Sequence, residues 1–158
     1  MELPFTLAKW DSKMPRRKGS SKRILIVDDE PQLLTLLTDV FQMYGWETKT
    51  ASNGQEAVMT TKIFKPSVIL SDVKMPTMDG LEFLIALTLV GDDTPVIFLS
   101  AFRDSKKTQM AWAHGAFDFL DKPFVVENLL QVCDNALETG RDYVRAARLR
   151  YQKMKKPA

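Results

Sequence analysis

Short runs of β-branched and apolar residues alternate along this chain with longer amphipathic stretches, and this alternation limits the possible folds more than any other feature. Each run is four or five residues long, as expected for strands buried in a sheet, and is followed by residues with helical spacing of the apolar positions. Five strands are predicted, at residues 24–27, 47–51, 68–71, 96–100 and 117–120.

Proline and glycine delimit the helices that follow these strands. Pro31 is suited to the first position of a helix, which we expect to stop at Gly45, and Pro66 closes the second helix. Gly91 and Gly115 follow the third and fourth helices. The predicted helices span residues 31–45, 55–64, 81–90 and 105–114, and a fifth begins near residue 125.

Strands joined by helices pair in parallel, and the helices then cover both faces of the sheet. Right-handed crossovers leave few topologies, of which we predict the flavodoxin-like order 2-1-3-4-5. A length of 158 residues, with 45% hydrophobic and 27% charged side chains, is enough for one complete domain. The fold class is therefore α/β, with a five-stranded parallel sheet and helices on both faces.

Charge divides the chain into three parts. Residues 1–23 carry seven basic and two acidic side chains, residues 141–158 carry seven and one, and residues 24–140 carry eight and 17. The acidic middle part argues against direct nucleic-acid binding by the core. We predict a flexible leader over residues 1–22, the folded domain over residues 23–139, and a basic helical extension or linker over residues 140–158.

The start of the sequence offers no segment that would target or anchor the chain. Its longest apolar run there, residues 24–27, is too short for a signal peptide or a membrane-spanning helix, so we expect a cytoplasmic location without membrane contact. The single cysteine, Cys133, and the single histidine exclude an internal disulfide and a thiolate or histidine metal cluster.

Polar side chains stand where four of the predicted strands end. Asp28 and Asp29 follow the first strand, Asp72 comes at the end of the third, Ser100 ends the fourth and Lys122 follows the fifth. Each alone could be a helix cap, a loop residue or a surface residue. Because ligand sites of such sheets lie beyond the carboxyl ends of the strands, we expect the five residues to converge on one edge.

These residue types together favour phosphoryl-transfer chemistry. Three carboxylates in one crevice repel one another unless protons or a cation neutralise them. Oxygen ligands without histidine or thiolate favour Mg²⁺. Lys122 adds a positive charge suited to phosphoryl oxygens, and Ser100 adds a hydroxyl donor. Asp72 could then act as the nucleophile, as carboxylates do in aspartyl-phosphate enzymes.

Four stretches closely resemble the receiver domains of bacterial two-component response regulators. They are ILIVDDEP at residues 24–31, SDVKMPTMDG at 71–80, LSA at 99–101 and GAFDFLDKPF at 115–124. The resemblance covers about residues 22–138, and the specificity is high because four separate motifs occur in the right order. It implies the receiver fold, which has the same sheet order 2-1-3-4-5.

Residue by residue, the resemblance implies a phosphorylation site. Asp72 would take a phosphoryl group from a sensor histidine kinase or a phosphotransfer protein. Asp29 would bind Mg²⁺ directly, and Asp28 mainly through water. Asp72 itself and the backbone carbonyl of Lys74 would complete the protein ligands. Lys122 would pair with Asp72 and then with the phosphoryl group.

The resemblance also implies a conformational switch. Ser100 would move its hydroxyl onto a phosphoryl oxygen, and the backbone amide of Ala101 would help to hold that oxygen. Phe119 stands at the switch aromatic position, where many members have tyrosine, so its ring would turn inward by packing alone. The face of the fourth helix, fifth strand and fifth helix would then change and signal to an output domain or partner. The Lys122–Pro123 peptide bond is expected to be cis.

Two other functions suit the same fold. An aspartate-nucleophile, metal-dependent phosphatase would need a second acid/base carboxylate near Asp72, where Val73 and Lys74 stand instead. A flavin-binding module would need a phosphate-binding loop after the first strand, where Asp28 and Asp29 would repel phosphate. A receiver, which is a signalling domain and not an enzyme acting on outside substrates, is therefore favoured, with the phosphatase as the alternative.

The fifth helix continues beyond the receiver pattern toward residue 153. Its apolar and small residues follow one another at alternating steps of four and three, as in the seam of a coiled coil. The seam residues are Val126, Leu130, Cys133, Leu137, Gly140, Val144, Ala147, Tyr151 and Met154. Either the seam packs on the sheet up to Leu137 and the rest frays, or the extension pairs in a homodimer or leads to an output domain.

Overall fold

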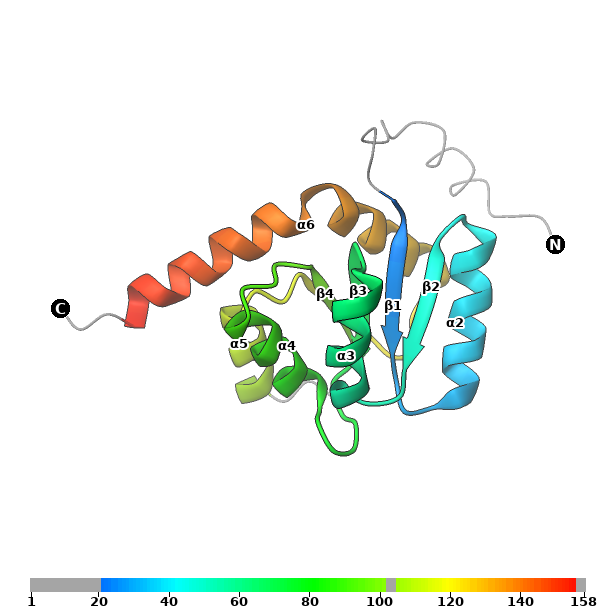
Figure 1. Cartoon of the computed structure of the whole chain (residues 1–158), viewed down its shortest axis with the longest axis horizontal. Coiled ribbons are helices and arrows are strands. Elements are labelled where there is room, and N and C mark those ends of the chain that lie inside the picture. Colours follow the sequence, from blue (N-terminus) through cyan, green and yellow to red (C-terminus); the bar gives the residue numbers. More distant parts are fainter. Residues whose placement is uncertain (1–20, 102–104, 156–158) are drawn as a thin grey trace.

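The computed structural model describes residues 21–101 and 105–155 of the chain. Most of the predicted leader and the last three residues of the predicted extension lie outside the described residues. Within the described ranges, strands and helices alternate in the predicted order (Figure 1).

The strands form one parallel sheet in the order β2-β1-β3-β4-β5, which confirms the predicted topology. Each strand begins and ends within one residue of its predicted bounds. The strands are β1 (Arg23–Val27), β2 (Glu47–Ala51), β3 (Val68–Asp72), β4 (Val96–Ser100) and β5 (Asp118–Asp121).

Local capping explains where several helices begin. Pro31 opens the first helix, the Asn53 side chain accepts a hydrogen bond from the Glu56 amide at 2.8 Å, and Asp79 forms a capping box with Glu82. Such caps each stabilise a helix by about 1 kcal/mol. The helices are α2 (Pro31–Met43), α3 (Gly54–Phe64), α4 (Gly80–Leu89), α5 (Ser105–Ala113) and α6 (Val126–Lys155).

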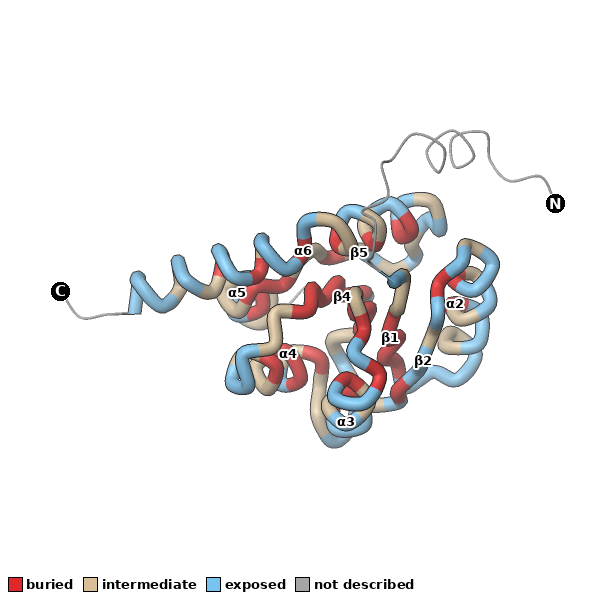
Figure 2. The backbone as a smooth tube through the Cα atoms, turned by 45° about the horizontal axis from the view of Figure 1, so that its top comes forward, coloured by how far each residue is buried: buried red, intermediate tan, exposed pale blue. Residues whose placement is uncertain are grey.

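Alternate residues of each strand point to opposite faces of the sheet, and both faces are covered. On one face, Ile24 and Ile26 of β1 pack with residues of α2 and α6. On the other face, Leu25 and Val27 pack with residues of α3, α4 and α5. Figure 2 shows the buried residues concentrated in the strands and on the inner sides of the helices. The predicted helix layers on both faces are therefore confirmed.

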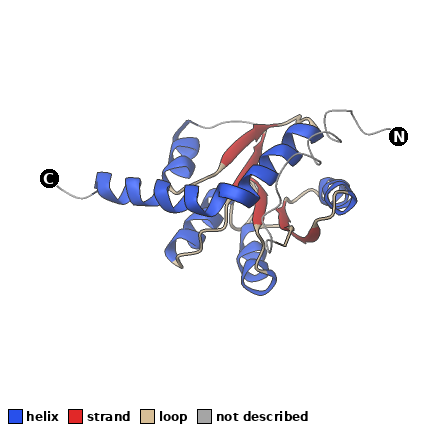
Figure 3. Cartoon of the chain, turned by 90° about the horizontal axis from the view of Figure 1, so that it is seen from above, coloured by secondary structure: helices blue, strands red, loops and turns tan. Residues whose placement is uncertain are grey.

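Helix α6 runs without interruption to Lys155 and extends well beyond the sheet (Figures 1 and 3). The expectation that it frays after Leu137 is therefore wrong, and the predicted boundary between residues 139 and 140 falls inside a helix. Fraying is prevented by packing, because Gly140 and Val144 of the predicted seam are buried against the chain's own residues. Among the described residues, no helix has the length and apolar character needed to cross a membrane.

Candidate functional site

Three carboxylates meet at the carboxyl edge of the sheet. Asp28 and Asp29 directly follow β1, and Asp72 ends the adjacent strand β3. One carboxylate oxygen from each residue lies within 4.8 Å of the others. The structure therefore brings together the three acidic residues that the strand ends predicted.

Asp28 is the most deeply placed of the three, with only 1% of its surface exposed. Its Oδ1 accepts a hydrogen bond from the Glu30 amide at 2.9 Å, and its own amide donates to the Ala51 carbonyl at 3.1 Å. Asp29, in contrast, is exposed. The site thus has a rigid carboxylate at its base and an accessible one at its rim.

Lys122 joins two of these carboxylates. Its Nζ lies 3.2 Å from Asp28 Oδ2 and 3.4 Å from Asp72 Oδ2. The lysine is positioned by the end of β5, since its backbone amide donates to the Ser100 carbonyl at 2.8 Å. The Lys122–Pro123 peptide bond is cis, as the resemblance implies. One ammonium group between the buried Asp28 carboxylate and the partly buried Asp72 carboxylate offsets their repulsion more strongly than it would in water.

The electrostatic surroundings shift the pKa values of Asp72 and Lys122. Burial raises the pKa of Asp72, Lys122 opposes this and Asp28 adds to it, so that the pKa lies above its usual value. Burial alone would lower the pKa of Lys122, but Asp72 and Asp28 raise it overall. The lysine therefore stays charged at neutral pH. A carboxylate with a pKa raised by burial beside a like charge is typical of a functional site.

The other predicted site residues lie on the neighbouring strand ends and loops. Ser100 ends β4, which adjoins β3, and is 5% exposed. Ala101 follows it and is exposed. Lys74 stands in the loop two residues after Asp72. The roles of the Lys74 carbonyl, the Ala101 amide and the Ser100 hydroxyl stay predictions.

Two buried glycines fix the loop between β3 and α4. The Gly80 amide donates to the Val73 carbonyl at 2.8 Å, and the Gly54 amide donates to the Met78 carbonyl at 2.9 Å. A Cβ atom at Gly54 would lie 2.6 Å from that same carbonyl oxygen, so only glycine permits this approach. Gly54 was not among the predicted site residues, because its neighbour lies 24 positions away along the chain.

The ring of Phe119 already lies inside the protein. It is 6% exposed, and its centroid lies 5.1 Å from the ring of Phe98 and 5.1 Å from that of Trp112. The expectation that the ring turns further inward on phosphorylation concerns a change between two states and stays a prediction. A phenylalanine has no hydroxyl that must reach water, so aromatic packing holds the ring inside.

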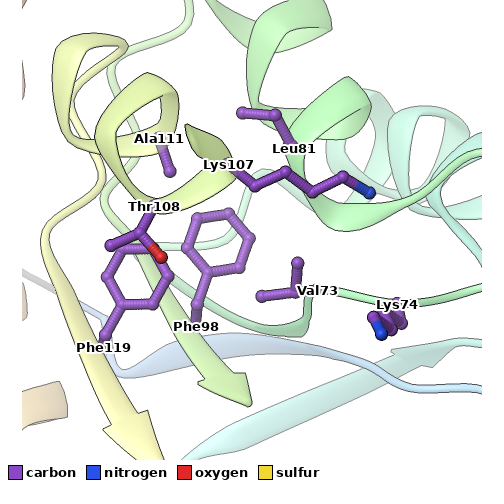
Figure 4. A pocket seen from close by; sticks show the side chains of 8 residues that line it. All are labelled: Val73, Lys74, Leu81, Phe98, Lys107, Thr108, Ala111 and Phe119. Atoms are coloured by element: carbon purple, nitrogen blue, oxygen red, sulfur yellow. The ribbon is translucent and has the colours of Figure 1, made fainter. Parts of the chain in front are cut away.

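Phe98 and Phe119 line a small pocket between α4 and α5 (Figure 4). Lys107 of α5 also lines the pocket and pairs with Asp79 Oδ2 at 3.2 Å, which ties α5 to the start of α4. The sequence carried no signal for this pair, because its members are 28 residues apart.

The donor set suits a hard divalent cation. Asp28, Asp29 and Asp72 offer only oxygen atoms, and they are the one group of acidic, histidine or cysteine side chains in the described part of the chain that is close enough to share an ion. Oxygen-only sites of this kind fit Mg²⁺ better than zinc or copper.

Comparison with known proteins agrees with this geometry. The family model of the response regulator receiver domain matches residues 24–134. The regulatory protein AtoC of Escherichia coli is 37% identical over 116 residues, which cover 73% of this chain and 25% of AtoC. The transcriptional regulatory protein TrcR of Mycobacterium tuberculosis is 37% identical over 119 residues, which cover 75% of this chain and 46% of TrcR.

Solved structures give the same result. The chemotaxis protein CheY4 of Vibrio cholerae is similar with a TM-score of 0.68 and 33% sequence identity, covering 73% of this chain and 98% of CheY4. The chain belongs to the response regulator receiver domains, the signal-receiving modules of two-component phosphorelay systems. It spans between a quarter and a half of the length of AtoC and TrcR. Family membership favours the receiver over the phosphatase alternative.

Proposed function

We propose that Asp72 accepts a phosphoryl group from the phosphohistidine of a sensor histidine kinase or a phosphotransfer protein. The observation that carries this proposal is the grouping of Asp28, Asp29 and Asp72 within 4.8 Å, with Lys122 bonded to two of them. Membership of the receiver family supports it.

The reaction needs little covalent chemistry from the protein. An Asp72 carboxylate oxygen attacks phosphorus, the bond between phosphorus and the donor imidazole nitrogen breaks, and its electron pair stays with that nitrogen. An acyl phosphate results. Lys122 then pairs with the phosphoryl oxygens, and the Ser100 hydroxyl and the Ala101 amide donate hydrogen bonds to them. Positioning and charge neutralisation supply the rate enhancement.

Mg²⁺ is the cofactor that these residues would hold. Asp28, Asp29, Asp72 and the Lys74 carbonyl would bind it, and it would neutralise negative charge on the phosphoryl oxygens. The hydrogen bond from the Glu30 amide keeps Asp28 in place for this role. Phosphorylation and self-catalysed loss of the phosphate are the only reactions we assign to the chain.

The signal leaves through the face formed by α5, β5 and α6. We expect the change there to begin with Ser100 and Phe119, which is already only 6% exposed, and to displace α5. An output domain or a downstream protein would respond to that change. The names of AtoC and TrcR identify those relatives as regulatory proteins, which suits such a role.

Incubation with acetyl phosphate and Mg²⁺, followed by intact-mass measurement, tests the proposal. The native chain should gain one phosphoryl group that hydroxylamine removes, and EDTA should prevent the gain. Asp72→Ala should gain none, whereas Asp39→Ala, a matched change at an exposed position of α2, should be labelled like the native chain. Equal labelling of Asp72→Ala, or no hydroxylamine-sensitive gain on the native chain, would overturn the proposal.

A further inference from the structure

Helix α6 continues for some twenty residues after the match to the receiver family ends at residue 134. This continuation is fastened to the chain's own loop before β4. Arg141 and Arg145 both donate hydrogen bonds to the Asp93 carboxylate, one to each oxygen. Burial would raise the pKa of Asp93, but the two arginines lower it overall, so the carboxylate is ionised and paired at neutral pH.

Arg148 connects α6 to two other parts of the fold. Its Nε donates to the His114 carbonyl at 3.1 Å, and a second nitrogen of the same guanidinium donates to the Asp92 carbonyl. His114 directly follows α5, whereas Asp92 lies in the loop between α4 and β4. One rigid, planar side chain therefore bridges the end of α5 and the loop that leads into β4.

Close packing completes the docked surface. A Cβ atom at Gly140 would lie 2.5 Å from the Pro95 side chain, so this position of the seam requires glycine. The centroids of two ring pairs, Tyr143 with Phe117 and Tyr151 with His114, lie 5.3 Å apart. From Leu130 to Ala147, most of the seam that the sequence suggested for a coiled coil is thus covered by the chain itself, whereas Met154 near the helix end is 82% exposed.

Helix α5 adjoins both this surface and the pocket beside the loop that follows Asp72. Toward its start, Lys107 pairs with Asp79 at 3.2 Å, and Ala111 lines the pocket that holds Phe119 (Figure 4). Its last turn leads to the His114 carbonyl that Arg148 holds. The helix is nine residues long, so it spans the distance between the two contacts in about two and a half turns.

We propose that residues 141–155 of α6 dock on the loop before β4 and on the end of α5, and that phosphorylation of Asp72 weakens this docking. This inference rests on the proposed function. Phosphorylation attracts Ser100, at the end of β4, and displaces α5 relative to the loop before β4. The Arg148 guanidinium donates to the His114 carbonyl, which would move with α5, and to the Asp92 carbonyl, which would stay with the loop. It therefore cannot keep both hydrogen bonds. Residues 141–155 then become free to contact an output domain or another protein.

Hydrogen exchange of backbone amides, with and without Mg²⁺ and beryllofluoride as a mimic of the phosphoryl group, tests the inference. In the native chain, exchange across residues 141–155 should be slow and should rise about fivefold or more when the mimic binds. Arg148→Ala should show fast exchange without the mimic and little further change. Arg150→Ala is the matched control, because Arg150 is exposed on the other side of the helix and its loss should leave exchange as in the native chain.

Reciprocity gives a second measurement that does not depend on exchange. If the mimic weakens docking by a given factor, loss of docking must strengthen binding of the mimic by the same factor. Arg148→Ala should therefore bind beryllofluoride about fivefold more tightly than the native chain and Arg150→Ala do.

The outcomes separate this inference from the proposed function. If the mimic leaves the amides around Asp72 and Ser100 unchanged, the proposed function fails. If those amides respond while residues 141–155 exchange equally in all three proteins, the inference alone is overturned. Protection of residues 141–155 that grows with protein concentration would also overturn it, because a second copy of the chain would then be covering the seam.

Discussion

Asp72 and Asp93 lie at opposite edges of the sheet and have opposite pKa shifts. At the carboxyl edge, burial and the nearby Asp28 outweigh Lys122 and raise the pKa of Asp72. At the amino edge, Arg141 and Arg145 outweigh burial and lower the pKa of Asp93. The first carboxylate is left short of positive charge and is ready for a cation and a phosphoryl group, whereas the second already has its full set of partners.

The two edges also differ in how they are built. The carboxyl edge combines residues from several strand ends, held by backbone hydrogen bonds such as that from Lys122 to Ser100. The amino edge is held by side chains of one long helix that contact residues 34 to 56 positions earlier. A change at one edge should therefore leave the other edge largely intact, apart from the link through α5.

The largest effect is expected from Lys122→Ala, which removes the ammonium group that Asp28 and Asp72 share. Loss of one positioned donor to the phosphoryl oxygens should slow labelling by acetyl phosphate roughly 100-fold. Lys49→Ala, at an exposed position of β2, serves as the control. Initial rates measured by intact mass check this prediction, and equal rates for the two variants would contradict it.

Two glycine substitutions, one at each edge of the sheet, should have similar effects on stability but different effects on Mg²⁺ binding. Gly54→Ala presses a methyl group against the Met78 carbonyl, and Gly140→Ala presses one against Pro95. Each should cost about 1–3 kcal/mol in the free energy of urea unfolding. Only Gly54→Ala should also weaken Mg²⁺ binding, followed by amide NMR, because it shifts the loop after Asp72. An equal loss of Mg²⁺ affinity in both variants would contradict this prediction, because the Mg²⁺ site would then depend on packing at the amino edge as well.

The smallest effects concern the two aspartates themselves. In EDTA at pH 7, Asp72→Asn should stabilise the fold by about 0.5–1 kcal/mol, because it removes a poorly paired carboxylate. Asp93→Asn should destabilise it by about 0.2–1 kcal/mol, since its partners are half exposed. Urea unfolding measures both. Added Mg²⁺ should stabilise the native chain and have less effect on Asp72→Asn.

The pH dependence follows from the directions of the two pKa shifts. The stabilisation that ionised Asp93 gives the fold is fully present above about pH 3.8, the pKa of the group in the unfolded chain. It is lost as the pH falls through the lower pKa that Asp93 has in the folded protein. The destabilisation caused by ionised Asp72 is absent below about pH 3.8, the pKa of the group in the unfolded chain. It grows as the pH rises through the higher pKa that Asp72 has in the folded protein. Acidification should therefore remove the advantage of Asp72→Asn before it removes the defect of Asp93→Asn. The reverse order in acid unfolding curves would contradict these assignments.

The sequence was sufficient for the features that depend on local patterns. Short runs of β-branched and apolar residues predicted the bounds of each described strand within one residue. Pro31, Gly45 and similar residues marked the ends of the helices between them. The grouping of Asp28 and Asp72 followed because parallel neighbouring strands end at the same edge.

Features that depend on packing between distant segments could not be predicted in the same way. The seam of α6 has the spacing of a coiled coil, but periodicity cannot say whether the partner is another chain or Pro95 of the same one. The inward position of Phe119 depends on Trp112, which lies on a different element. Three-dimensional contacts decide both questions.

Chemical trapping of the acyl phosphate is the most direct test of the central claim. Sodium borohydride reduces an aspartyl phosphate to homoserine, so labelling with acetyl phosphate and Mg²⁺, reduction and peptide mass spectrometry locate the modified residue. The account predicts homoserine at position 72 and no conversion when EDTA is present. Homoserine at position 28 or 29, or no conversion at all in a labelled chain, would contradict it.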